Sequence, residues 1–218
     1  MSSALLYRTS GIALLLGAVL AIIGNVLGTI LFPGNDPHQY SNALWLIVML
    51  LSFIGSLVLL LGLPAVCVRQ AERAGWLGLI GFVLTMIGGF LFTGFSLIPL
   101  LVLPWLAQTA PKLAASSGPP SFFVFFLVAS LVFVVGGILL GIAIMRARIL
   151  PRWAGALILV GAVLNLVSFP LSGAISNILG TVAFVLFAVG IGWIGSTLMS
   201  TGSMEAAQPA PAPIEASS

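Results

Sequence analysis

The stretch from Phe122 to Met145 reads FFVFFLVASLVFVVGGILLGIAIM, contains no charged residue and would be apolar on every face of a helix. It is long enough to cross a bilayer, which takes about 20 apolar residues in a helix. The whole chain is also strongly apolar, with 61% hydrophobic and 5% charged residues. An ordinary globular domain has roughly 25% charged residues. A soluble protein of this composition would expose more apolar surface than water tolerates. The sequence therefore predicts an integral membrane protein.

The apolar stretches are predicted to be helices rather than strands of a barrel. Membrane strands alternate apolar and polar residues over about ten positions, whereas these stretches are continuously apolar. A continuous apolar segment satisfies its backbone hydrogen bonds in lipid by forming a helix. The expected fold class is all-α, a polytopic transmembrane helical bundle.

Charged residues and clusters of Pro and Gly divide residues 1–200 into a six-helix transmembrane domain. The expected spans are residues 11–32, 43–64, 75–98, 121–145, 153–169 and 175–199. Between the third and fourth, residues 97–120 form an apolar loop that we expect to lie at the membrane interface or to re-enter it, either as a packed lid or as a gate. Residues 201–218 are rich in Pro, Ala and Ser and are expected to form a disordered cytoplasmic tail.

The basic residues predict the orientation. Six of the seven fall on one side of the expected spans, namely Arg8, Arg69, Arg73, Arg146, Arg148 and Arg152, and Lys112 falls on the other. Loops rich in Lys and Arg stay in the cytoplasm. We therefore expect a multi-pass protein of the plasma membrane with both termini cytoplasmic. Trp45 and Trp105 would then lie at the outer interface and Trp76 at the inner one.

A short pattern occurs three times. It reads Gly, five residues, Gly, one residue and Val-Leu, and it begins at Gly11, Gly75 and Gly155. It predicts three tandem helical hairpins, related by rotation about the membrane normal. Separate GxxxG patterns at residues 24–28 and 137–141 permit close helix contacts. These contacts would form either within the chain or in a homo-oligomer.

The sequence offers little for catalysis. None of the four acidic residues (Asp36, Glu72, Glu205 and Glu215) lies in an expected span, and the chain has one His and one Cys. Buried ionisable groups, which proton transfer in a membrane usually needs, are therefore lacking. His, Cys and carboxylates also do not combine into a metal or haem site. We expect no enzyme, no cofactor and no metal, and the dispersed net charge of +3 does not indicate nucleic-acid binding.

A few polar residues in the spans are candidates for ligand binding. Thr85 and Asn165 occupy equivalent positions of the repeat, ten residues after Gly75 and Gly155, and Asn25 lies in the first span. They either bond neighbouring helices or line a central site for a neutral or weakly polar ligand. At the inner surface, Arg146, Arg148 and Arg152 either only set the topology or also contact anionic lipid.

The segment RILPRWAG at residues 148–155 resembles an element between helices of uncharacterised bacterial six-helix integral membrane proteins, which are grouped in families of unknown function. The resemblance extends over residues 5–200 and implies no activity. Two functions stay open. The leading one is a non-enzymatic protein with a structural, regulatory, or lipid- or partner-binding role. The alternative is a small transporter or permease component for an uncharged or hydrophobic substrate, which would need a polar, water-accessible cavity around Thr85 and Asn165.

The orientation can be tested by labelling single cysteines in intact cells. Cysteines at Asn35 or Ser117 should react with a membrane-impermeant reagent from outside, because both lie on the side with few basic residues. Cysteines at Gln70 or Ala147 should not. The reverse pattern would contradict the predicted orientation.

Overall fold

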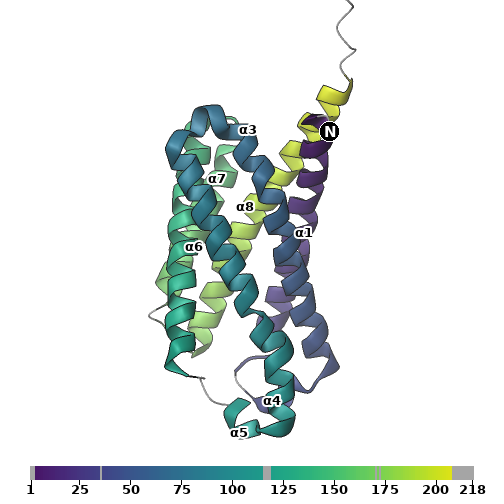
Figure 1. Ribbon diagram of the computed structural model, residues 1–218, viewed down its shortest axis with the longest axis vertical. Coiled ribbons are helices and arrows are strands. Elements are labelled where there is room, and N and C mark those ends of the chain that lie inside the picture. The colour runs from purple at the N-terminus through teal and green to yellow at the C-terminus, as the bar shows by residue number, and fades with distance from the viewer. Residues whose placement is uncertain (1–2, 35, 115–118, 170, 172, 208–218) are drawn as a thin grey trace, which may run out of the picture.

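The structure, a computed structural model, describes residues 3–34, 36–114, 119–169, 171 and 173–207. Of the described residues, 92% are helical and none forms a strand. The bundle consists of α1 (Ser3–Leu31), α3 (Ala43–Phe95), α6 (Pro120–Ala147), α7 (Arg152–Ser168) and α8 (Gly173–Ala207). Short helices cover one end of it, namely α2 (Pro37–Tyr40), η1 (Ile98–Val102), α4 (Leu103–Thr109) and α5 (Pro111–Ala114) (Figure 1). The predicted all-α helical bundle is confirmed.

Helix α3 contains two of the expected spans. The chain doubles back at Gly75, whose φ of 56° and ψ of −156° lie in a region open essentially only to glycine. Helical structure extends to this turn from both sides, so there is no loop between the spans, and α3 arches over one end of the bundle (Figure 1). The glycine that begins the second copy of the repeat is thus the residue that reverses the chain.

The protein is membrane-embedded. In the described part of the chain, five helical stretches are long and apolar enough to cross a bilayer: Leu5–Leu31, Ala43–Gln70, Arg73–Thr109, Pro120–Ala147 and Gly173–Ser200. Large apolar side chains such as Leu61 and Ile175 face outward, 68% and 69% exposed, as a lipid-facing surface requires. Helix α7 has 17 residues, at the lower limit for a crossing. The number of six crossings therefore stays a prediction.

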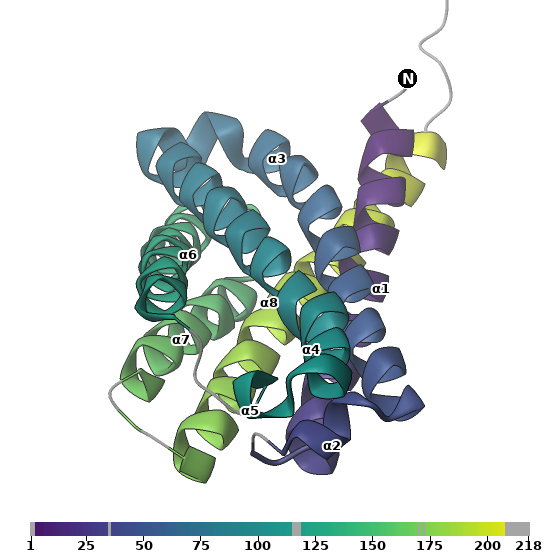
Figure 2. The same ribbon diagram turned by 60° about the horizontal axis from the view of Figure 1, so that its bottom comes forward.

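The two ends of the bundle differ. One end, here the terminal end, carries the start of α1, the end of α8, the turn at Gly75 and the α6–α7 turn (Figure 1). The other, the cap end, carries α2, η1, α4 and α5. Figure 2 shows these short helices gathered beside α1 and the first half of α3. The six arginines lie toward the terminal end and Lys112 lies in α5. Which end faces the cytoplasm stays a prediction.

The burial of two residues changes how the orientation should be tested. Gln70 and Ala147 are buried, at 1% and 5% exposure, so cysteines there would stay unlabelled whichever side they faced. Arg73 and Arg148 lie at the same end and are exposed, so they are the better positions. Asn35 and Ser117 lie outside the described residues.

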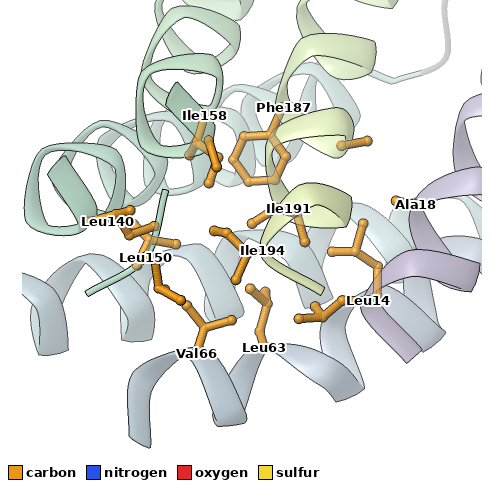
Figure 3. Close-up of a cluster of buried hydrophobic side chains, with 14 of the residues drawn as sticks. Leu14, Ala18, Leu63, Val66, Leu140, Leu150, Ile158, Phe187, Ile191 and Ile194 are labelled. Atoms are coloured by element: carbon orange, nitrogen blue, oxygen red, sulfur yellow. The ribbon is translucent and has the colours of Figure 1, made fainter. Parts of the chain in front are cut away.

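The hydrophobic core fills the terminal half of the bundle. Side chains from α1, α3, α6, α7 and α8 converge there (Figure 3). The fully buried members include Leu14, Leu63, Leu140, Ile144, Ile158, Ile191 and Ile194. Every long helix contributes side chains to this core, which closes the terminal half of the bundle.

Glycines bring the helix backbones together at equivalent places in the three hairpins. A side chain at Gly17 would collide with the backbone of Leu59, and one at Gly161 would approach the backbone nitrogen of Phe187. Gly81 faces the backbone of Leu140 in the same way. The second glycine of each repeat copy thus contacts the next helix. These equivalent contacts support the internal repeat, which stays a prediction.

The GxxxG glycines also contact helices of the same chain. Gly24 lies against Ser52, Gly141 faces the carbonyl oxygen of Gly155, and Gly137 lies beside Phe187. These faces are therefore covered within one molecule and are not available to a second copy. A homo-oligomer, which nothing here tests, would need another surface.

One local expectation needs correction. Helix α8 continues to Ala207, seven residues into the segment expected to be a disordered tail, because Met204, Glu205 and Ala206 favour helix and the first proline is Pro209. The later residues lie outside the described part. Trp45, expected near the outer interface, lies at the cap end and is buried within the protein, at 7% exposure; its place at the interface stays a prediction.

Replacing Gly136 with Leu should disrupt the contact between α3 and α6, because any side chain there meets the backbone of Thr85. We expect a loss of about 1–3 kcal/mol or more in stability, measured as a lower melting temperature in detergent. Gly94→Leu is the control, since a side chain at Gly94 meets nothing within 4 Å. Equal melting temperatures for the two variants would contradict the close contact.

Candidate functional site

The cap half of the bundle encloses a cavity of about 660 Å³. This volume lies within the roughly 300–1,000 Å³ of small-molecule sites. Leu60, Leu63 and Phe187 of the core form its floor, and near the cap end it reaches exposed residues, Phe123 and Asn177. The five long helices all contribute to its walls. The bundle is therefore closed at its terminal end and hollow toward its cap end.

All three predicted ligand-binding residues line this cavity. Asn25 is half-buried, and the Oδ1 atom of Asn165 is buried without a hydrogen-bond partner. Thr85 is completely buried, and its hydroxyl donates a 2.7 Å hydrogen bond to the carbonyl oxygen of Gly81. The structure thus brings the three residues together, but only the two asparagines have side-chain groups free for a ligand.

Further polar residues of the cavity were missed in the sequence. Thr29 lies four residues after the predicted Asn25, and two further pairs at the same spacing are Ser52 with Ser56 and Asn177 with Thr181. Residues at this spacing share one face of a helix, which is the signal that could have revealed them. Ser130, a buried polar residue of α6, is not part of the lining.

Most hydroxyl protons around the cavity are used by the helix backbone. Thr93 donates to the carbonyl oxygen of Gly89 at 2.8 Å, and Ser168 donates to that of Asn165 at 2.7 Å. Ser52 and Ser56 differ, because neither hydroxyl has a partner among the described residues. Their protons and lone pairs are free for a molecule in the cavity.

Phenylalanine rings form one continuous side of the cavity, here the aromatic wall. Phe92 contacts Phe126 and Phe133 edge-on, at centroid distances of 5.4 and 5.6 Å. Phe133 lies 4.8 Å from Phe187, and Phe126 lies 5.8 Å from Phe169. The wall therefore joins α3, α6, the end of α7 and α8. Aromatic pairs of this geometry stabilise one another beyond their buried area.

Trp45 attaches the cap to the bundle beside the cavity. Its indole Nε1 donates a 2.9 Å hydrogen bond to the carbonyl oxygen of Pro99 in η1. Its ring meets Phe32 and Tyr40 edge-on, at 5.1 and 4.9 Å. Residues 98–114 of the expected loop thus form short helices that contact α2 and α3. Trp45 also lines the cavity, so the cap and the site share this residue.

The chemistry available in the cavity is uncharged. Among the described residues, its lining contains only apolar, aromatic, hydroxyl and amide side chains. A charged ligand would be removed from water with no opposite charge to compensate it. Within the described residues, no group of three or more His, Cys, Asp or Glu side chains lies together. The arrangement suits binding of a neutral molecule.

The arginine candidates lie at the other end of the bundle. Arg146, Arg148 and Arg152 are exposed around the α6–α7 turn. Arg148 adopts the left-handed conformation, with φ 56° and ψ 23°, directly after α6. They are therefore separate from the cavity and free to meet lipid head groups, which stays a prediction.

A second, smaller hollow lies beside the turn at Gly75. Its volume is about 290 Å³, and Cys67, Gln70 and Trp76 are among its lining residues. Both side-chain polar atoms of Gln70 are buried without a partner. This amide was not singled out in the sequence.

No protein-family model, curated protein or solved structure matches the chain. Its function must therefore be argued from the cavity itself.

A cysteine in place of Ser56 should react readily with N-ethylmaleimide in detergent-solubilised protein, in a background lacking Cys67. The cavity admits water, in which the thiol can ionise and react. Ser130→Cys is the matched control, because Ser130 is completely buried on α6 and outside the lining. Equal labelling rates at the two positions would show that the cavity is inaccessible.

Proposed function

We propose that this protein is a non-enzymatic carrier or permease component that holds an uncharged, largely apolar molecule inside its helical bundle. The cavity around Asn25 and Asn165 is the observation that carries the proposal. Its size, its uncharged polar groups and its aromatic wall suit a small neutral ligand. A purely structural role would be better served by a bundle that is solid along its whole length.

The distribution of packing supports a carrier. A carrier has to separate the two sides of the membrane while its binding site is open to one of them. Here the core around Leu63 and Ile191 closes the terminal half, whereas the cavity reaches the cap end. A substrate could enter from the cap end and would pass the core only if the helices there moved apart.

We place the protein in the plasma membrane, with both termini cytoplasmic and six crossings. The arginines at the terminal end support this orientation through the positive-inside rule. The cavity would then open toward the outside. Arg148 and Arg152 would contact anionic lipid of the inner leaflet, where each basic residue contributes about 1 kcal/mol.

The proposal predicts that a small uncharged molecule co-purifies with the protein. The protein would be extracted from its native membrane in polymer nanodiscs, and its bound molecules identified by mass spectrometry. Ser56→Phe should fill part of the cavity and reduce the amount of retained ligand about tenfold. A steric clash that weakens the binding free energy by about 1.4 kcal/mol has that effect. Ser196→Phe on the exposed face of α8 should retain it.

The same mass spectra also distinguish the cavity ligand from lipid bound at the arginines. An Arg148→Ala, Arg152→Ala variant should lose phosphatidylglycerol or cardiolipin and keep the cavity ligand. If wild type and Ser56→Phe carried the same molecules in the same amounts, the proposed function would be wrong.

A further inference from the structure

Resting on the proposed function, we infer that the ligand is a flat, uncharged aromatic molecule with a hydroxyl or carbonyl oxygen on one side. The inference follows from which groups are free in the cavity and from where they lie relative to the aromatic wall.

Three polar side chains that lack partners lie on one side of the cavity, and a fourth, Asn165, lies on α7 beside the aromatic wall. Ser52 and Ser56 belong to the first half of α3, and Asn25 belongs to the adjoining helix α1. Gly24, next to Asn25, lies directly against Ser52, so the two helices are in close contact here and all three polar residues line the cavity. We call Asn25, Ser52 and Ser56 the polar side. Each of them can donate a hydrogen bond to an oxygen atom and accept one from a hydroxyl.

The aromatic wall lies across from the polar side. It is centred on α6, which stands on the opposite side of the bundle from α1 (Figure 2). Helix α6 contributes only phenylalanines to the lining, namely Phe123, Phe126 and Phe133. A molecule between the two sides thus meets hydroxyl and amide groups along one edge and aromatic rings along the other.

This arrangement selects among neutral ligands. An aliphatic chain would use the aromatic wall but would leave the polar side unpaired, and removing such groups from water without partners is unfavourable. A sugar would pair with the polar side, but along the rings Asn165 alone could not pair with the many hydroxyl groups that remain. A ring with an oxygen substituent satisfies both, because aromatic rings favour edge-to-face and offset contacts with other rings.

Asn165 indicates that a hydroxyl suits the site better than a bare carbonyl. Its Oδ1 atom is buried without a partner, and this atom can only accept a hydrogen bond. A phenolic hydroxyl could donate to such an acceptor or to a serine oxygen, and could accept from Ser52 or Asn25 with its lone pairs. An ether or a ketone could only accept.

Three related probes test the inference. They are β-naphthol, its methyl ether, which cannot donate, and decalol, its saturated counterpart, which has no aromatic face. Binding of each radiolabelled probe to the protein in nanodiscs is measured by equilibrium dialysis, with empty nanodiscs subtracted for lipid partitioning. We expect β-naphthol to bind about tenfold more tightly than either relative, as loss of one buried hydrogen bond or of ring stacking would produce.

Variants on the two sides of the cavity test which residues cause each binding preference of β-naphthol. A variant with Ser52→Ala, Ser56→Ala and Asn165→Leu, which removes the serine and Asn165 acceptors for a ligand hydroxyl, should abolish the preference of β-naphthol over its ether. Phe126→Leu should abolish its preference over decalol. Ser130→Ala is the control, since it removes a buried serine hydroxyl outside the cavity and should preserve both preferences. Equal affinity of the three probes for wild type would overturn the inference and leave the proposed function intact. No saturable binding of any probe, together with no molecule co-purified from native membranes, would overturn both.

Discussion

The structure depends on close contact between helix backbones at glycine. Lipid is as apolar as a leucine side chain, so helices in a membrane gain little by burying apolar residues against each other. What holds them together is short-range contact, which is best where no side chain separates the backbones. Gly17, Gly81 and Gly161 provide such contacts in the three hairpins. The core in the terminal half is a consequence of these contacts as much as of its leucines and isoleucines.

The cavity follows from a change in side-chain size along the helices. Helix α6 has Gly136, Gly137 and Gly141 toward the terminal end and Phe123 and Phe126 toward the cap end. Small residues let its neighbours approach, whereas bulky rings keep them apart. Because the rings contact one another rather than the opposite helices, a space remains between them and α1. The same gradient therefore explains the closed half and the hollow half.

Composition and charge were enough to predict the fold class and the positions of the apolar stretches, because lipid restricts the chain to continuous apolar helices. They did not reveal that α3 reverses at Gly75, since the φ and ψ of one residue decide between a loop and a sharp turn. Asn25 and Asn165 were found because an amide is rare in an apolar span. Ser52 and Ser56 were missed because serine is common there. The aromatic wall depends on which helices are neighbours, and the repeat alone did not specify this.

The amide of Gln70 has a consequence for the closed end of the molecule. Leaving a buried polar group unpaired costs about 1–3 kcal/mol, and neither polar atom of this side chain has a partner. Water reaching the turn at Gly75 would remove that penalty. The closed end of the bundle therefore contains one amide that would gain hydrogen bonds from water, so separating the helices there would cost less free energy than exposing apolar side chains alone.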